Sequence, residues 1–129
     1  KTTEYSAIQP HLVYELISRG ISRSVQSGQD CMLLNIQADR FIQLKEDLGI
    51  AKAEKVAHSL VMFIVQLFDH NLDCGRVSEN CFVIVLPDTA EEKAVELAAD
   101  ICQQIEQQVF DIDDETFSLT TSIGITGLN

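Results

Sequence analysis

Residues 72–86 read LDCGRVSENCFVIVL, in which two mainly apolar stretches flank the polar triplet Ser78-Glu79-Asn80. Apolar and β-branched runs joined by a short polar turn are typical of a β-hairpin, and Asn80 suits a positive φ in such a turn. We therefore predict strands over residues 72–77 and 81–86. The elements on either side of this hairpin decide the fold class.

Helices are predicted on both sides of the hairpin, because apolar residues recur there every three or four positions. Gly49 is expected to end the short helical segment 40–47, and Asp88 or Thr89 is expected to cap the helix that follows the hairpin. The predicted helices span residues 6–26, 40–47, 51–69 and 90–109.

Two further strands complete the pattern. Residues 31–36 are almost continuously apolar, which favours a strand covered on both faces. Residues 117–126 alternate between apolar and polar side chains and predict the last strand, and the acidic residues 111–115 are predicted to form a loop or edge. The order predicts an α+β fold of the βαββαβ, ferredoxin-like type. Its mainly antiparallel sheet has helices packed on one face, and an N-terminal helix is added, all in a single domain over residues 1–129.

The composition limits the classes of partner. The chain has 129 residues, 46% of them hydrophobic, which is enough for a packed core, and its formal net charge is −11. Nucleic acids and anionic membrane surfaces are not expected as partners, because both are bound through clustered Lys and Arg. The longest apolar runs, residues 60–65 and 82–86, are too short to cross a bilayer.

The four cysteines form no C-x-x-C pair and have no histidine at ligand spacing, so we predict neither a metal site nor a cofactor. Reduced, mostly buried thiols predict a reducing compartment and therefore a cytoplasmic location. Two acidic groups are interpreted as solvated turns and not as metal ligands. They are Asp39 with Glu46 and Asp47, and the run 111–115.

Residues 76–82, RVSENCF, resemble the R-x-G-G-[DE]-E-F signature of GGDEF (diguanylate cyclase) domains, with Phe82 as its last residue. Three more motifs are similar at the family's spacing: DRF at 39–41 to D-x-F-K, LPDT at 86–89 to L-P-x-T, and SIGI at 122–125 to S-I-G-[VI]. Together they cover nearly the whole chain. The resemblance implies a fold of the adenylate-cyclase palm type, in a family that joins two GTP molecules into cyclic di-GMP.

The resemblance also implies that the residues of this reaction are missing. The family holds Mg²⁺ with carboxylates at two positions that are Gln37 and Asn80 here, both neutral amides. The last acid of the signature is replaced by Cys81, and a buried thiol is a poor base. We therefore expect no catalytic residue and no bound metal.

The nucleotide-binding positions depart from the family as well. Ser78 and Glu79 replace the two glycines that let the hairpin approach the nucleotide, and Glu79 adds a negative charge facing the triphosphate. One guanine-reading position is Lys45, which can only donate hydrogen bonds, and the other is Glu54, which can still accept them. The phosphate-binding Lys of the family corresponds to Ile42.

The inhibitory product site is also expected to be absent. The family's R-x-x-D corresponds to residues 69–72, DHNL, and Asp69 would repel the phosphates that an Arg would clamp. Arg76 remains from the signature and is interpreted as a structural residue inside the hairpin.

Two functions from different classes follow from the resemblance. The first is a catalytically inactive regulatory or scaffold domain of cyclic di-GMP signalling, which relays to or dimerises a neighbouring domain. That neighbour would be an EAL phosphodiesterase, a PAS or a receiver domain, in a FimX-like arrangement. The chain is then expected to be a fragment of a longer protein, and this fragment lacks the family's final helix. A homodimer is a further option. The second function is a sensor that binds GTP through Glu54 without turnover and controls an attached phosphodiesterase domain.

Overall fold

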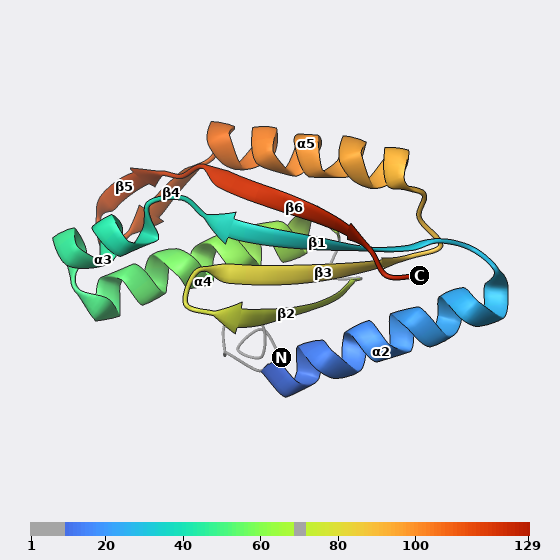
Figure 1. Cartoon of the computed structure of the whole chain (residues 1–129). Coiled ribbons are helices and arrows are strands. Elements are labelled where there is room, and N and C mark those ends of the chain that lie inside the picture. Colours follow the sequence, from blue (N-terminus) through green and yellow to red (C-terminus); the bar gives the residue numbers. More distant parts are fainter. Residues whose placement is uncertain (1–9, 69–71) are drawn as a thin grey trace.

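The computed structural model describes residues 10–68 and 72–129 and contains an antiparallel sheet with the strand order β2-β3-β1-β6 (Figure 1). A second, two-stranded sheet is formed by β4 and β5. The predicted α+β fold with a mainly antiparallel sheet is confirmed. The elements are α2 (Pro10–Ser27), β1 (Cys31–Ala38), α3 (Phe41–Leu48), α4 (Ile50–Leu67), β2 (Asp73–Ser78), β3 (Cys81–Pro87), α5 (Glu91–Gln107), β4 (Val109–Ile112), β5 (Glu115–Ser118) and β6 (Thr121–Gly127).

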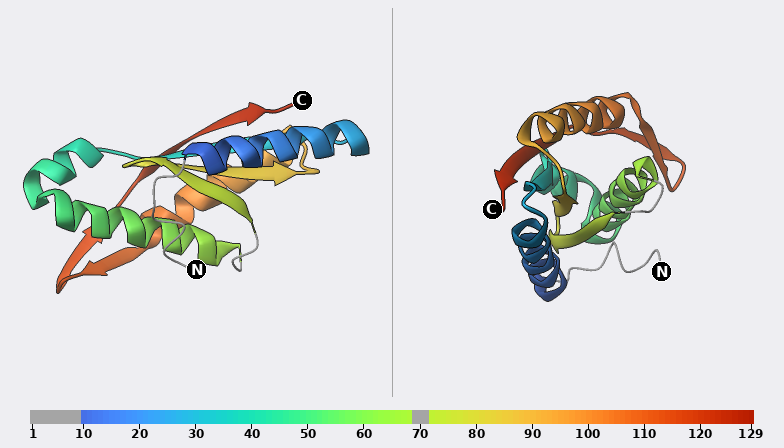
Figure 2. Two further views of the ribbon diagram at one scale, coloured as in Figure 1. Left: turned by 90° about the horizontal axis from the view of Figure 1, so that it is seen from below. Right: turned by 90° about the vertical axis from the view of Figure 1, so that its right-hand side faces the viewer.

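Helices cover both faces of the main sheet, because alternate side chains of its strands join two different clusters. Leu34 of β1 and Ile84 of β3 pack with α4 and α5 in the main core, whereas Cys31 and Val85 pack against Leu16 of α2. Figure 2 shows α2 and α5 on opposite sides of the strands. The prediction of helices on one face is therefore correct for α4 and α5, but α2 covers part of the other face.

Two glycines let α2 lie close to the sheet. A Cβ on Gly75 of β2 would come within 2.6 Å of Val13 Cγ2, and a Cβ on Gly20 of α2 would come within 2.9 Å of Cys31 Sγ and of Val85 Cγ1. A side chain at either position would collide with its neighbours. Residues 6–9, where the N-terminal helix was predicted to begin, lie outside the described residues.

The central hairpin has the predicted strands but a different turn. Ser78 pairs with Cys81, so the loop is the two residues Glu79 and Asn80, and a bulge lies between Arg76 and Ser78. Asn80 is not among the described residues with positive φ, so that prediction was wrong. The bulge takes up the extra residue in β2, which allows the shorter turn.

The predicted last strand over residues 117–126 is wrong, because the chain divides there into β5 and β6. The acidic stretch before it forms a tight turn at Asp113 and Asp114, with φ values of 51° and 69°. Phe110 and Ile112 of β4 are buried while Asp111 between them is exposed, so the β4–β5 ribbon has one face on the core.

The helix ends differ in one respect from the predictions. Gly49 ends α3 with a φ of 89°, as predicted. The residue before α5 is Ala90, with no side-chain cap, so neither Asp88 nor Thr89 caps that helix. Thr89 instead donates to the Pro87 carbonyl, and Asp88 accepts a hydrogen bond from Arg23. None of the helices in the described residues is long and apolar enough to cross a membrane.

Candidate functional site

The end of β1, the start of α3 and the hairpin turn bring several predicted site residues together. Gln37 and Cys81 are partners in the β1–β3 register, and the Asn80 backbone carbonyl accepts a hydrogen bond from the Ala38 N–H at 3.0 Å. A pocket of about 230 Å³ between them is lined by Gln37, Asn80 and Ile42. The structure thus places the two predicted metal positions and the predicted phosphate position around one hollow.

The oxygen donors of this pocket are weak ligands for a divalent ion. Gln37 and Asn80 offer neutral amides, and the Asn80 side chain donates to the Ala38 carbonyl at 3.4 Å. Asp39 also lines the pocket, but its carboxylate accepts hydrogen bonds from the Thr120 and Ser122 hydroxyls at 2.7 and 2.8 Å. Within the described residues, no group of three or more His, Cys, Asp or Glu is placed to hold a metal ion. Because Mg²⁺ prefers charged oxygens, this donor set does not fit it.

Lys45 and Glu79, two of the residues that depart from the family pattern, form an ion pair with each other. The Lys45 Nζ lies 2.7 and 2.8 Å from the two carboxylate oxygens of Glu79. Lys45 comes from the last turn of α3, and Glu79 comes from the hairpin turn. The family motifs pointed to a nucleotide as the partner of each residue, so this contact was not predicted, although the opposite charges of Lys45 and Glu79 could have suggested it.

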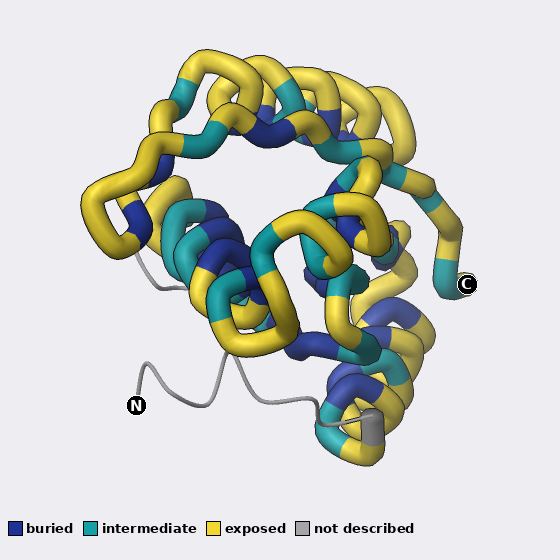
Figure 3. Tube along the Cα trace, turned by 90° about the vertical axis from the view of Figure 1, so that its left-hand side faces the viewer, coloured by how far each residue is buried: buried dark blue, intermediate teal, exposed yellow. Residues whose placement is uncertain are grey.

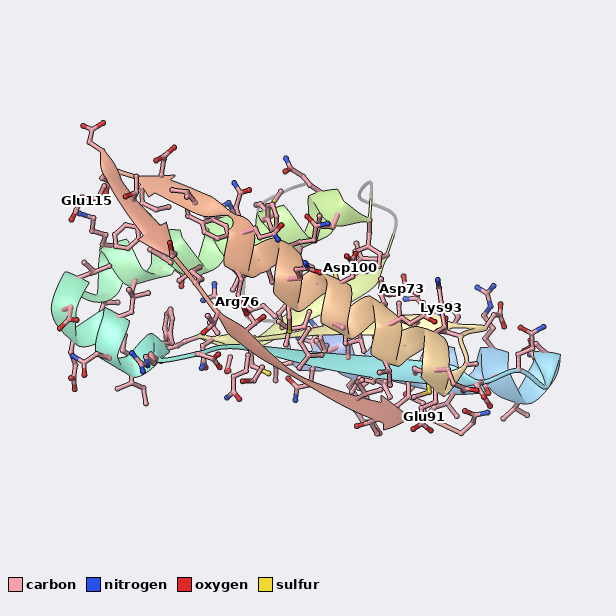
Figure 4. The ribbon with its side chains drawn as sticks, turned by 90° about the horizontal axis from the view of Figure 1, so that it is seen from above. Asp73, Arg76, Glu91, Lys93, Asp100 and Glu115 are labelled. Carbon is pink, nitrogen blue, oxygen red and sulfur yellow. The ribbon has the colours of Figure 1, made fainter. Side chains whose placement is uncertain are left out.

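Glu54, the remaining predicted guanine reader, is bound by Arg76. The guanidinium donates to both carboxylate oxygens of Glu54, at 2.5 and 2.8 Å, and also to the Ser78 and Glu79 carbonyls. Arg76 is only 2% exposed and lies among the strands (Figure 4), whereas the Glu54 side chain is 51% exposed. This bidentate contact connects α4 to the hairpin turn. It also occupies the Glu54 carboxylate, which was predicted to be able to accept hydrogen bonds from guanine.

The remaining signature residues are built into the sheet. Phe82 is buried in the main core, and Ser78 pairs with Cys81 at the end of the hairpin. The Cys81 thiol donates to the Asn35 side-chain oxygen at 2.7 Å, and burial raises the pKa of this thiol. A raised pKa lowers the thiolate fraction, so Cys81 is a weak nucleophile and a weak base here. Asp69, the first residue of the predicted product-site stretch, lies outside the described residues.

The buried cysteines predict a pH-dependent stability. Burial raises the pKa of the Cys74 thiol from 9.0 to about 12, and the neighbouring Asp73 carboxylate adds to the rise. Between these values the folded chain keeps a proton that the unfolded chain has lost. The contribution of this thiol to the free energy of unfolding is therefore expected to be fully present below about pH 9. The free energy of unfolding is expected to fall as the pH rises from 9 toward 12.

Urea unfolding at pH 8.0, 9.0 and 10.0 measures this effect. The matched variant Cys74→Ala is expected to start from a lower stability and to lose less of it per pH unit, because the thiol is gone. An equal slope in the variant and the parent chain would contradict the assignment to Cys74.

The four-stranded antiparallel sheet with helices on both faces has the architecture of a cyclase palm fold. The family model "Diguanylate cyclase, GGDEF domain" matches residues 11–129, and the chain belongs to this family of cyclic di-GMP signalling. No curated protein matches the chain.

Several solved structures are similar to the chain in fold. The GGDEF domain of FimX from Pseudomonas aeruginosa has 19% identity and a TM-score of 0.83, over 91% of this chain and 72% of that one. The diguanylate cyclase SiaD from the same organism, in complex with its activator SiaC, has 21% identity and a TM-score of 0.82, over 92% and 45%. The active GGEEF domain of a diguanylate cyclase from Vibrio cholerae has 24% identity and a TM-score of 0.76, over 90% and 75%.

Proposed function

We propose that this chain is a catalytically inactive GGDEF domain that acts as a regulatory or scaffold module in cyclic di-GMP signalling. The observation that carries the proposal is the Lys45–Glu79 ion pair, which joins α3 to the hairpin turn beside the pocket of Gln37 and Asn80. Lys45, at a position that a cyclase would direct at guanine, is here paired with Glu79, which stands where the family has a glycine.

Electrostatics supports the loss of catalysis. Phosphoryl transfer needs a divalent ion held by carboxylates, because the ion must offset charge that develops on the phosphate. The pocket presents the amides of Gln37 and Asn80 instead, and Asp39 is engaged by two hydroxyl groups. Glu79 adds a negative charge where a triphosphate would approach. These features each lower the affinity for Mg²⁺ and for phosphate.

The contacts of the cleft also oppose guanine binding. A base that reached Glu54 would compete with Arg76, which already donates to both of its carboxylate oxygens. Charge-assisted hydrogen bonds are stronger than neutral ones, so an exchange of partners is unfavourable. Lys45 has no acceptor to offer to the N–H groups of guanine.

One observation favours the second candidate, a GTP sensor without turnover. The Glu54 side chain is 51% exposed, so its carboxylate is within reach of solvent and of a ligand. A sensor would need only recognition of the base, because it would not have to hold a metal ion for chemistry.

Calorimetric titration with GTP, with and without Mg²⁺, separates the two candidates. We expect no saturable heat in either case, whereas the active Vibrio cholerae relative, as the positive control, is expected to bind. Saturation in the micromolar range would contradict the scaffold proposal and support the sensor. Glu79→Gln is a matched variant, since it removes the charge but keeps the size of the side chain. We expect this variant to give no saturable heat either, because the amides of Gln37 and Asn80 remain. Formation of cyclic di-GMP from GTP would overturn both candidates.

The scaffold proposal extends to the surroundings of the domain. We propose that it works beside an EAL, PAS or receiver domain of the same chain, in a cytoplasmic protein, and that it contributes to dimerisation. The similarity to the FimX domain supports such a setting only through the fold. The nucleotide experiment does not depend on which neighbour is present.

A further inference from the structure

A groove runs between α4 and β4. It consists of two adjoining hollows of about 450 and 310 Å³, which share His58, Ser59 and Asp111 in their walls. One wall is formed by α4 from Glu54 to Gln66, and the other by residues 108–113. The β4–β5 ribbon is mostly exposed and forms the left edge of the view in Figure 3.

The outer edge of β4 faces this groove. Among the described strands β4 pairs only with β5, and Ile112 and Glu115 flank the two-residue turn of their ribbon. In such a hairpin the flanking pair is hydrogen-bonded and the next pair is not. The backbone N–H and C=O of Asp111 therefore point away from β5. Both hollows are lined by α4 and β4 and by no residue of β5. We therefore infer that these backbone groups face the groove.

The walls of the groove combine apolar surface with negative charge. Met62 and Phe63 of α4 contribute apolar surface at one end. The other end is lined by Lys55 and by three acidic residues, Glu54, Asp111 and Asp113. Lys55 is paired with Asp113 at 3.1 Å, and Glu54 is paired with Arg76. Asp111 thus contributes a negative charge at the centre. A basic ligand is favoured over an acidic one, in keeping with the net charge of −11.

The length of the groove suits a short extended segment. The lining part of α4, residues 54–66, is about 18 Å long at the helical rise. An extended chain of five or six residues covers the same distance. Its alternate side chains would point toward the groove floor and away from it, so apolar and basic residues in alternation match both walls.

We propose that the α4–β4 groove binds an extended, basic segment of a partner protein, which adds to the edge of β4 as a third strand. The Asp111 N–H donates to a carbonyl of the segment, and the Asp111 C=O accepts from one of its N–H groups. The Asp111 carboxylate attracts a basic side chain, and Met62 and Phe63 take up an apolar one. The groove shares Glu54 with the nucleotide cleft. The contacts proposed for Asp111, Met62 and Phe63 do not involve this residue, so they hold whether or not the domain binds GTP.

Titration of the ¹⁵N-labelled chain with the probe peptide acetyl-Lys-Val-Lys-Val-Lys-Val-amide tests the proposal in about 150 mM salt. We expect saturable shifts of the amide signals of residues 58, 62 and 109–112, and slower hydrogen exchange of the Asp111 amide. The matched peptide with Glu in place of Lys is expected to give no saturable shift. Absence of saturation by the lysine peptide at about 1 mM would overturn the proposal.

Two variants and one altered peptide separate strand addition from general charge attraction. Asp111→Lys is expected to weaken binding about tenfold, because it reverses the charge at the centre of the groove. Asp100→Lys on the exposed surface of α5 (Figure 4) makes the same change elsewhere and is expected to leave binding unchanged. A peptide N-methylated at its central valine loses one backbone donor and is expected to bind about tenfold more weakly.

Equal losses in the two lysine variants, or shifts spread over α5, would show charge attraction alone and overturn the proposal. Self-association of the chain that Asp111→Lys abolishes would assign the β4 edge to a second copy and would overturn it as well.

Discussion

Arg76→Ala is expected to lower the free energy of unfolding by about 3 kcal/mol, an effect measured by urea unfolding. Arg76 is 2% exposed, and its guanidinium donates to the Ser78 and Glu79 carbonyls as well as to Glu54. Its removal leaves backbone acceptors of the hairpin turn without this donor and opens a cavity in the core. The ion pair itself contributes less, because Glu54 is half exposed to water.

The control for this variant is Arg23→Ala, which removes the same side chain from another ion pair. Arg23 contacts Asp88 at 2.8 Å, but their side chains are 61% and 32% exposed. We expect a loss below about 1 kcal/mol. Similar losses in the two variants would mean that the buried contacts of Arg76 do not stabilise the hairpin. Arg76→Lys keeps the charge but not the planar group, so it is expected to recover only part of the stability.

Ile64→Ala is expected to lower the free energy of unfolding by about 3–4 kcal/mol. Ile64 lies on the face of α4 that packs against the sheet, and it is fully buried in the main core. The substitution loses the transfer free energy of its methyl and methylene groups and leaves a cavity that the packed strands only partly close. Urea unfolding monitored by circular dichroism measures the change.

Ile50 provides the matched control in the same helix. It is the first residue of α4 and is 74% exposed, so Ile50→Ala makes the same chemical change at the surface. We expect a change within about 0.5 kcal/mol, since alanine also favours the helix. A loss at residue 50 equal to that at residue 64 would contradict the placement of the core face of α4.

Local patterns were enough to predict most of the fold. The apolar period of α4 and α5, the two strands of the central hairpin and the helix end at Gly49 depend on neighbouring residues, and the structure contains them. The division between β5 and β6 was missed, because the alternation of residues 117–126 continues across the break at Leu119 and Thr120. That break depends on where β6 pairs with β1, which is a contact between distant parts of the chain.

The candidate site was predictable in position but not in its contacts. The spacing of the family motifs assigned Gln37, Asn80 and Ile42 to one nucleotide site, and in the structure the three residues line one pocket. The partnership of Lys45 with Glu79 joins residues 34 positions apart, and a sequence reveals such a pair only after α3 and the hairpin turn have been placed side by side. The groove along α4 was also missed. The acidic run 111–115 was interpreted as a solvated turn, and only the structure shows that part of it lies beside α4.

The close approach at Gly20 and Gly75 has a mechanical consequence. With no space for a methyl group at either contact, α2 cannot slide along the sheet unless Val13, Cys31 or Val85 is displaced. A push or a twist applied to this helix is therefore transmitted to β2 and β3, whose shared turn carries Glu79 and Asn80. We therefore expect α2 and the hairpin to move together, so that a displacement of the helix also shifts the turn.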